Sequence, residues 1–555
     1  MWTIDLTGNE WNVRQEDDES APCRASVPGC VHMDLMREGR IEDPFYRDNE
    51  TDLMWVGEKT WIYERTFMVD SALLRRTCIL LQCEGLDTLA TIEINGQTVG
   101  SANNMFRLWE YDIRDALREG ENTIAVRFDS ALSYGREQQS GDRYKWCGGA
   151  AHRLDGGNQV RKEQCNFGWD WGPMCVTCGI WRPIRVLAMD IVRLTDVQIH
   201  QYHAPSGDVE LDVALTVDQV DRSVPLQAHV SVCYEGETVA KQSGLELTNG
   251  RGWVSLHIPD PHLWWPNGMG DQHLYTVWVE LQDATGRDLD RAEKRVGLRT
   301  LELVQKLDQW GQSFYFAANG VPFYAKGANW IPGDVFQARM TDERYRYLLE
   351  SARHANMNML RVWGGGIYEE DAFYNMCDEL GLCVWQDFMF ACACYPAEDD
   401  TFMDNCREEF VQNVRRLRHH PSLAIWCGNN ELEQMHVMND DGSDGKMKWV
   451  DYSRLFDMLI PSVLRDEDPD RPYIPSSEHS PVGNREDSSN PNWGDAHLWS
   501  VWHGRQPFEW YRTTFHRFCS EFGFQSFPEP LTVDTYTLPK DRNITSPVME
   551  HQQRS

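Results

Sequence analysis

LAIWCGNNEL, residues 423–432, is the stretch of this 555-residue chain that says most about its fold. The first five residues are apolar, as in a short buried strand, and the strand ends abruptly at Gly428. Asn429, Asn430 and Glu431 follow at once, so two amides and a carboxylate lie at the end of an apolar strand. Burying such groups is costly unless they meet a polar ligand. The pattern therefore predicts a ligand site at this strand end.

A second strand end of the same kind occurs about ninety residues later. The run FCSEFGFQS, residues 518–526, carries Glu521 directly after apolar residues. The chain has 86 acidic residues, and a single glutamate is more often a solvated surface charge. Position distinguishes Glu431 and Glu521, because each closes an apolar strand beside glycine or amide residues.

Composition limits the class of protein. The length predicts three or four domains, and the hydrophobic content of 41% is ordinary for a globular chain. A net charge of -33 argues against nucleic-acid partners and against anionic membrane surfaces. No segment approaches the roughly 20 apolar residues of a membrane span, and the N-terminus lacks the pattern of a secretory signal. We therefore predict a cytoplasmic protein with no nucleic-acid or membrane partner.

The sixteen cysteines are few for so long a chain, which favours reduced thiols over a disulfide scaffold. Cys175-x-x-Cys178, with Cys165 upstream, is the one spacing that resembles a metal site. A single pair without a second pair of ligands is a weak signal for zinc. We predict no metal and no organic cofactor.

The first half of the chain has the pattern of β structure. Residues 1–190 contain many short strands, and Asn95-Gly96 between two of them predicts a type I′ hairpin. This pattern favours a jelly-roll-like sandwich. Residues 191–298 alternate strictly between apolar and polar positions, which is typical of an immunoglobulin-like sandwich.

Apolar strands alternate with helices in residues 299–555, a pattern typical of a catalytic (β/α)₈ barrel. Thr341 is the predicted N-cap of the first helix. Seven strands are predicted, at Phe323–Lys326, Met359–Val362, Cys383–Gln386, Leu423–Cys427, Tyr473–Ser476, His497–Val501 and Arg517–Ser520. An eighth is not found, so we expect a barrel truncated before its eighth strand. Unpaired edges on the first and seventh strands would then make these 555 residues poorly soluble and nearly inactive.

Glu431 ends the fourth predicted strand and Glu521 ends the seventh, and the barrel brings all strand ends to one rim. Two carboxyl groups facing each other about 5–5.5 Å apart are the equipment of a retaining glycosidase. Aromatic and polar residues cluster at the other strand ends, where they would suit the faces and hydroxyls of a sugar. These clusters are Gly327–Pro332, Arg361–Gly366, Trp385–Phe388 and Asp495–Trp499. Core filling is the alternative for Trp363 and Trp385.

These motifs resemble the β-mannosidases of glycoside hydrolase family 2. The resemblance covers nearly the whole chain, and it implies the domain order given above. The segments that carry it are WCGNNE (426–431), SEFGFQSFP (520–528), RVWGGGIYEED (361–371), GANWIPGD (327–334), NFGWDWGP (166–173) and LWWPNGMGDQHLY (263–275). Members of this family extend well past the nucleophile, through an eighth barrel strand and further β domains.

The resemblance also implies roles for individual residues. Glu431 would be the acid/base and Glu521 the nucleophile. Asn430 would bind the sugar 2-hydroxyl, and Arg361 would support the nucleophile. Four further residues are implied to bind substrate: Trp363 as a wall of the site, Asp170 and Trp169 reaching in from the first domain to grip mannose hydroxyls, and His497. His497 is followed by Leu498, where many relatives are expected to carry an aromatic residue.

The sequence thus predicts a retaining exo-β-mannosidase that removes terminal β-D-mannose from the non-reducing end of β-mannoside oligosaccharides. One alternative is another family 2 exo-glycosidase, a β-glucosaminidase or a β-galactosidase. The GNNE run and the Trp-Asp-Trp loop argue against it. The alternative outside the enzyme class is an inactive sugar-binding fragment. The sequence does not specify an oligomeric state.

Overall fold

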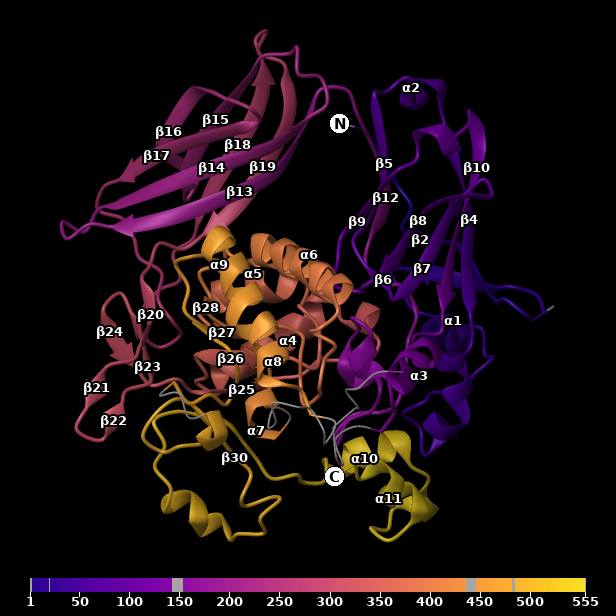
Figure 1. The fold of residues 1–555 in the computed structure, drawn as a ribbon, viewed down its shortest axis with the longest axis vertical. Coiled ribbons are helices and arrows are strands. Elements are labelled where there is room, and N and C mark those ends of the chain that lie inside the picture. The colour runs from indigo at the N-terminus through magenta and orange to yellow at the C-terminus, as the bar shows by residue number, and fades with distance from the viewer. Residues whose placement is uncertain (1, 19, 142–152, 436–445, 482–484, 555) are drawn as a thin grey trace.

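The structure is a computed structural model that describes residues 2–18, 20–141, 153–435, 446–481 and 485–554. Figure 1 shows three regions: a sandwich near the N-terminus, a second sandwich beside it, and a helix-rich region below and between them. Among the described residues, no helix is both long and apolar enough to cross a membrane.

The first region packs two antiparallel sheets around an apolar core, which confirms the predicted sandwich. The smaller sheet contains, in spatial order, β1 (Trp2–Asp5), β12 (Ile184–Met189), β5 (Cys78–Cys83) and β9 (Trp109–Asp112). The larger sheet contains β3 (Cys23–Val27), β2 (Gly8–Gln15), β4 (Trp61–Val69), β10 (Gly120–Asp129), β7 (Leu89–Ile94) and β8 (Gln97–Asn103). The short strands β6 (Leu86–Asp87) and β11 (Gly179–Ile180) pair beside them. Helices α1 (Val31–Arg37), α2 (Ser71–Leu74) and α3 (Ala131–Gly141) complete the region.

The predicted hairpin is confirmed. Ile94 and Gln97 pair directly across a two-residue turn, in which Asn95 and Gly96 have φ values of 52° and 78°. Positive φ at both central residues is the requirement of a type I′ turn.

The second region is also a sandwich of antiparallel sheets, as predicted. One sheet contains β13 (Val192–His203), β14 (Val209–Gln219) and β17 (Arg251–Ile258). The other contains β16 (Glu237–Glu246), β15 (Leu226–Tyr234), β18 (Tyr275–Asp283) and β19 (Asp288–Val296). Alternate residues of β14 are buried, in keeping with the period of two in its sequence.

The third region begins with small antiparallel sheets. Strands β20 (Leu301–Val304), β23 (Tyr315–Ala318) and β24 (Val321–Phe323) form one, and β21 (Leu307–Asp308) and β22 (Gly311–Gln312) form another. A five-stranded parallel sheet follows in chain order: β25 (Gly327–Trp330), β26 (Met359–Val362), β27 (Cys383–Asp387), β28 (Leu423–Cys427) and β29 (Tyr473–Ile474). Strands β30 (Ala496–Leu498) and β31 (Cys519–Phe522) form a separate parallel pair.

Helices connect most of the parallel strands. The connecting helices are α4 (Asp342–His354), α5 (Asp371–Leu380), α6 (Asp400–Leu417), α7 (Leu432–Met435), α8 (Trp449–Tyr452) and α9 (Ile460–Glu467). The hydroxyl of Thr341 accepts a hydrogen bond from the Arg344 amide, so the predicted N-cap is confirmed. Helices α10 (Pro530–Tyr536) and α11 (Pro547–Gln552) end the described chain and lie near the first region, where Arg47 pairs with Asp541.

The first predicted parallel strand, Phe323–Lys326, is wrong. Ala318 pairs with Val321 across an Asn319-Gly320 turn whose φ values are both positive, so Val321–Phe323 belongs to an antiparallel hairpin. The parallel strand lies at Gly327–Trp330 instead. A Cβ atom on Gly327 would lie 1.7 Å from the Met359 carbonyl oxygen, so this strand must begin with glycine. Because this position must be glycine, the strand sequence Gly-Ala-Asn-Trp lacks the run of large apolar residues that marks a strand.

The last strand begins and ends two residues later than predicted. Arg517–Ser520 was predicted, but β31 covers Cys519–Phe522, so Glu521 lies within the strand. Strands β25 and β31 meet through a hydrogen bond of 3.2 Å from the Asn329 amide to the Ser520 carbonyl oxygen. No strand is found among the described residues after Phe522.

Candidate active site

The side chains of Glu431, His497 and Glu521 meet at the carboxyl ends of β28, β30 and β31. One ligand-type atom of each, two carboxylate oxygens and one ring nitrogen, lies within 4.8 Å of the others. Glu431 follows β28 with a φ of 65°, which is an uncommon conformation for a non-glycine residue. Its amide donates to the Ser477 carbonyl oxygen at 2.8 Å, which helps to hold that conformation. Unusual backbone geometry of this kind is often found at functional sites.

Arg361 lies beneath the carboxylates and binds four acceptors. Its Nη1 donates to Glu521 at 2.5 Å and to the Asn329 amide oxygen at 3.0 Å. Its Nη2 donates to Asp387 and to the Asn430 amide oxygen, both at 2.8 Å. Burial alone would lower the pKa of Arg361, but the carboxylates of Asp387 and Glu521 raise it. The guanidinium thus stays charged and fixes the Glu521 carboxylate.

Asp387 is a third carboxylate in this network and is fully buried. Besides Arg361, it accepts hydrogen bonds from the Gly364 amide at 3.1 Å and the Trp385 indole at 3.0 Å. Burial raises the pKa of Asp387, and Arg361 opposes that shift. Asp387 binds the Nε and Nη2 edge of the Arg361 guanidinium, whereas Glu521 binds Nη1. Asp387 therefore holds Arg361 in the orientation that supports Glu521.

Glu431 and His497 form a close pair. The Nδ1 atom of His497 lies 2.7 Å from Glu431 Oε1 and 3.4 Å from Glu521 Oε2. Burial alone would raise the pKa of Glu431, but the His497 hydrogen bond and charge lower it to about 2. Burial alone would lower the pKa of His497, but Glu521 and Glu431 raise it to about 9. Both shifts favour an imidazolium beside a carboxylate over the neutral pair.

Buried hydroxyl and carboxyl groups fix the other side of the His497 ring. The Ser477 hydroxyl lies 3.0 Å from His497 Nε2 and donates to Asp495 at 2.7 Å. The Ser520 hydroxyl donates to the same Asp495 oxygen at 2.6 Å. The backbone amide of His497 donates to Glu478 at 3.0 Å. This arrangement sets the ring plane of His497.

Aromatic residues from two regions wall the site. Trp363 follows β26, and Trp169 and Trp171 come from the first region, with ring centroids 4.6 and 5.4 Å from Trp363. Asp170 lies between the two tryptophans and is half-buried. Burial raises the pKa of Asp170, His503 opposes that shift, and Glu431 and Glu521 add to it. Among the described residues, no other side chain donates a hydrogen bond to the Asp170 carboxylate, so it can accept hydroxyl groups of a ligand.

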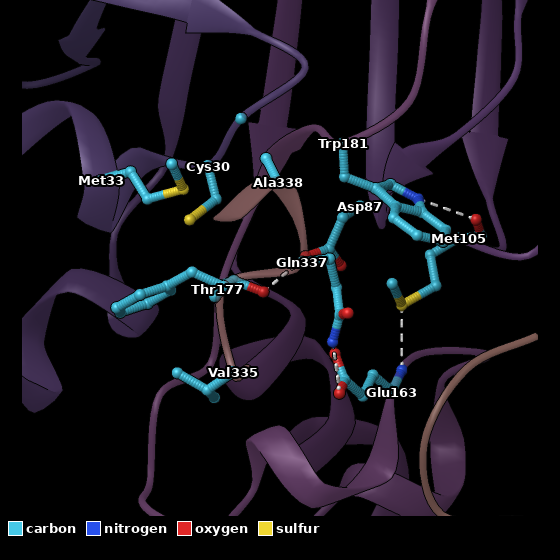
Figure 2. A pocket seen from close by; sticks show the side chains of 12 residues that line it. Cys30, Met33, Asp87, Met105, Glu163, Thr177, Trp181, Val335, Gln337 and Ala338 are labelled. Carbon is cyan, nitrogen blue, oxygen red and sulfur yellow. Dashed lines mark hydrogen bonds between the residues drawn. The ribbon is translucent and has the colours of Figure 1, made fainter. Parts of the chain in front are cut away.

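The loop that carries Asp170 is anchored to the third region. The Cys165 amide donates to the Gly365 carbonyl oxygen at 2.9 Å, and the Glu163 carboxylate accepts from Gln337 at 2.8 Å. Figure 2 shows the small pocket beside this joint, where Glu163 and Gln337 face Met105 and Asp87. Its volume of about 10 Å³ is too small for a sugar. The joint holds the first region against the mouth of the site.

The same three groups, Glu431, His497 and Glu521, have the spacing of metal ligands. A metal would require His497 to be neutral, whereas its pKa of about 9 favours the imidazolium at neutral pH. Cys175 and Cys178, singled out by their spacing, are buried free thiols. Burial raises the pKa of both thiols.

All eight predicted site residues lie around this one site. Further residues contribute to the site and were not assigned, among them Asn329, Asp387, Cys392, Ser477 and Trp499. Three of these, Asn329, Asp387 and Trp499, lie in the aromatic and polar clusters recognised at strand ends. Cys392 and Ser477 carried no signal, because a thiol or hydroxyl in a loop has neither charge nor a diagnostic spacing.

Comparison with known proteins shows the class. A model described as "Glycosyl hydrolase 2 galactose-binding domain-like" matches residues 11–182, and one described as "Glycosyl hydrolases family 2" matches residues 192–299. The crystal structure of a β-D-mannosidase from Dictyoglomus thermophilum superposes with a TM-score of 0.92 at 39% identity, covering all of this chain and 67% of that one. The chain belongs to glycoside hydrolase family 2.

Two curated relatives named β-mannosidase B match most of the chain. A β-mannosidase B of Neosartorya fischeri is 36% identical over 95% of this chain. A β-mannosidase B of Emericella nidulans is 36% identical over the whole chain. The chain spans 63% and 66% of the length of these two relatives. An exo-chitosanase from Amycolatopsis orientalis, at 18% identity and a TM-score of 0.64, shares the fold; the match covers 90% of this chain and 56% of that one.

Proposed function

We propose that this chain is a retaining exo-β-mannosidase. The observation that carries the proposal is the pair Glu431 and Glu521, at the end of β28 and in β31, with one carboxylate oxygen of each within 4.8 Å of the other. A short separation suits a nucleophile and an acid/base acting on one anomeric carbon, because retaining enzymes hold their carboxyl groups about 5–5.5 Å apart and inverting enzymes about 6.5–9.5 Å. The β-mannosidase relatives support mannose as the sugar.

In the first step Glu521 attacks the anomeric carbon and the bond to the leaving oxygen breaks. Arg361 holds the Glu521 carboxylate by Nη1, which leaves the other oxygen beside Trp499 and His497. Glu431 protonates the leaving oxygen. The proton it needs lies on His497 Nδ1, 2.7 Å from Glu431 Oε1, and passes to Glu431 as the leaving group departs.

In the second step Glu431 acts as base. It takes a proton from water, and the resulting hydroxide equivalent displaces Glu521 from the sugar with retention overall. The mannosyl ester on Glu521 removes one of the two negative charges that face His497. His497, left neutral by the first step, then faces the Glu431 carboxylate alone, and it regains its proton through Glu431 when Glu431 deprotonates the water.

Asp170, Trp169, Trp363 and Asn430 form the proposed mannose site. The free Asp170 carboxylate can accept two sugar hydroxyls, and the tryptophans provide apolar faces. Arg361 binds the Asn430 amide oxygen, which orients the amide nitrogen toward the site. Closure of the site by Asp170 from the first region favours cleavage at a chain end, and therefore an exo mode.

The same proposal includes the domain limits 1–190, 191–298 and 299–555, with the third forming a (β/α)₈-type barrel. Alternation of β25–β31 with helices α4–α9 supports it. A cytoplasmic location is supported by the free thiols among the described residues. Short β-linked manno-oligosaccharides are the proposed substrates.

A panel of nitrophenyl β-glycosides tests the proposal. We expect release of nitrophenol from the mannoside in preference to the glucosaminide and galactoside, and proton NMR should show β-mannose as the first product. Preference for another sugar would replace mannosidase by another family 2 activity. First formation of α-mannose would exclude the retaining mechanism. Mannose binding without turnover of any glycoside would indicate a sugar-binding protein.

A further inference from the structure

Cys392 lies against the proposed acid/base, and neither the mechanism nor the family motifs use it. It follows β27 in the run FMFACACYP, residues 388–396, and is 4% exposed. Its Sγ donates to Glu431 Oε2 at 3.1 Å, and the Asn430 amide nitrogen donates to Sγ at 3.3 Å. The thiol therefore bridges the two residues that close the fourth parallel strand.

The backbone fixes the thiol in this position. The Cys392 amide donates to the Asn430 carbonyl oxygen at 3.0 Å, and the Asn430 amide donates to the Phe390 carbonyl oxygen at 2.9 Å. Cys392 has a φ of 45°, and Glu431 also has a positive φ, so two unusual backbone conformations face each other. These backbone hydrogen bonds fix the position of the Cys392 thiol relative to Glu431.

The chemistry of the thiol suits a donor. Burial raises the pKa of Cys392 well above its ordinary value, and Glu431 raises it further, so sulfur keeps its proton. A thiol is a weak hydrogen-bond donor. It can orient a carboxylate without stabilising the charged form as strongly as a hydroxyl or an ammonium group would. The thiol therefore positions the Glu431 carboxyl group while adding little to the stabilisation that His497 already gives its charged form.

The two oxygens of Glu431 thus have different partners. Oε1 faces His497 and Oε2 faces the thiol. We propose that Cys392 is a positioning residue that orients the Glu431 carboxyl group for proton transfer and ties it to the Asn430 amide. This inference rests on the proposed function, since it assigns Glu431 the part of acid/base.

The test uses substrates that differ in their need for an acid. Cys392→Ala removes the donor, and Cys392→Ser keeps one. One ordinary hydrogen bond contributes about 0.5–1.5 kcal/mol, so Cys392→Ala should lower kcat/KM for a β-mannobioside about 2- to 13-fold. For 2,4-dinitrophenyl β-mannoside, whose leaving group needs no proton, kcat/KM should stay within about twofold of wild type. Azide should raise kcat of Cys392→Ala on that substrate, because attack by azide needs no base.

The controls separate positioning from packing. Cys392→Ser should recover more than half of the lost kcat/KM on the mannobioside. Cys383, a fully buried thiol at the start of β27, provides the matched change: Cys383→Ala should leave the ratio of the two kcat/KM values unchanged. Equal losses on both substrates, no loss on either, or Cys392→Ser as impaired as Cys392→Ala would each overturn the inference. A wild-type chain that is soluble and folded, yet hydrolyses neither mannoside, would overturn the proposed function itself.

Discussion

Substitution of Asp170 by alanine separates a substrate-gripping carboxylate from a structural one. Asp170 is half-buried beside Trp169 and Trp171, and burial raises its pKa. Each hydrogen bond from a sugar hydroxyl to a charged acceptor contributes about 1.5–3 kcal/mol. Two such bonds, one to each carboxylate oxygen, amount to about 3–6 kcal/mol. At about 1.4 kcal/mol per factor of ten, Asp170→Ala should lower kcat/KM about 10²- to 10⁴-fold.

The stability of the folded chain should hardly change in Asp170→Ala. Among the described residues the Asp170 carboxylate receives no hydrogen bond from another side chain, so its removal breaks no side-chain hydrogen bond among them. The free energy of unfolding should therefore change by about 0.5 kcal/mol or less. The assay pairs steady-state hydrolysis of nitrophenyl β-mannoside with thermal unfolding of the same preparation.

Asp334 is the structural counterpart for this experiment. Its carboxylate accepts from Arg339 at 2.9 and 2.8 Å and from Arg344 at 2.9 Å, and it accepts from the Phe336 amide at 3.0 Å. Asp334→Ala should lower the melting temperature and leave activity per folded molecule nearly unchanged. If Asp170→Ala instead behaved like Asp334→Ala, Asp170 would be a structural corner and the reasoning about the mannose site would be refuted.

The site and its supports give four further predictions. Glu521→Ala should abolish hydrolysis without azide trapping of a retained product, whereas Glu431→Ala should be rescued by azide on 2,4-dinitrophenyl β-mannoside to give β-mannosyl azide; rescue of the opposite variant would reverse the roles. The pKa of His497 is raised to about 9, so kcat/KM for a mannobioside should be flat near neutral pH and should fall as pH rises through about 9. A profile that stays flat to pH 10 would contradict the transfer of a proton from His497 to Glu431. The contribution of His497 to stability has the same sign: it is full below pH 6.5 and is lost as pH rises through about 9, which urea unfolding at several pH values would measure. Thr341→Ala removes an N-cap and should lower the free energy of unfolding by about 1 kcal/mol without changing activity per folded molecule, whereas a loss of activity would place α4 in the catalytic machinery.

Most of the fold could be predicted from patterns that lie within a single segment of the sequence. Met359–Val362 and Leu423–Cys427 were predicted to the residue, because an apolar run bounded by polar residues needs no knowledge of its neighbours. The strand at Gly327–Trp330 was misplaced by several residues. Its glycine is required by the approach of the Met359 carbonyl oxygen, a contact made across 32 residues of sequence. The Asn319-Gly320 turn is the local feature that favours the competing hairpin.

The site divides in the same way. Glu431 and Glu521 were recognisable because a carboxylate at the end of an apolar strand is unusual. The role of Arg361 was predicted from the family motifs. Asp387 was not assigned, since its partnership with Arg361 depends on the parallel register of β26 and β27. Cys392 depends on a bridge between the loop after β27 and the end of β28. Contacts that arise from the pairing of distant strands have no local pattern in the sequence.

The most direct test of the central claim is covalent trapping of the nucleophile. Incubation with 2-deoxy-2-fluoro-β-mannosyl fluoride slows release of the glycosyl-enzyme, because fluorine destabilises the transition state and the fluoride leaving group still allows its formation. Mass spectrometry should find one fluoromannosyl group per chain, on the peptide that contains Glu521. The label should be absent from Glu521→Ala. An adduct on another residue, or an unlabelled chain that still hydrolyses β-mannosides, would contradict the assignment of Glu521 as nucleophile.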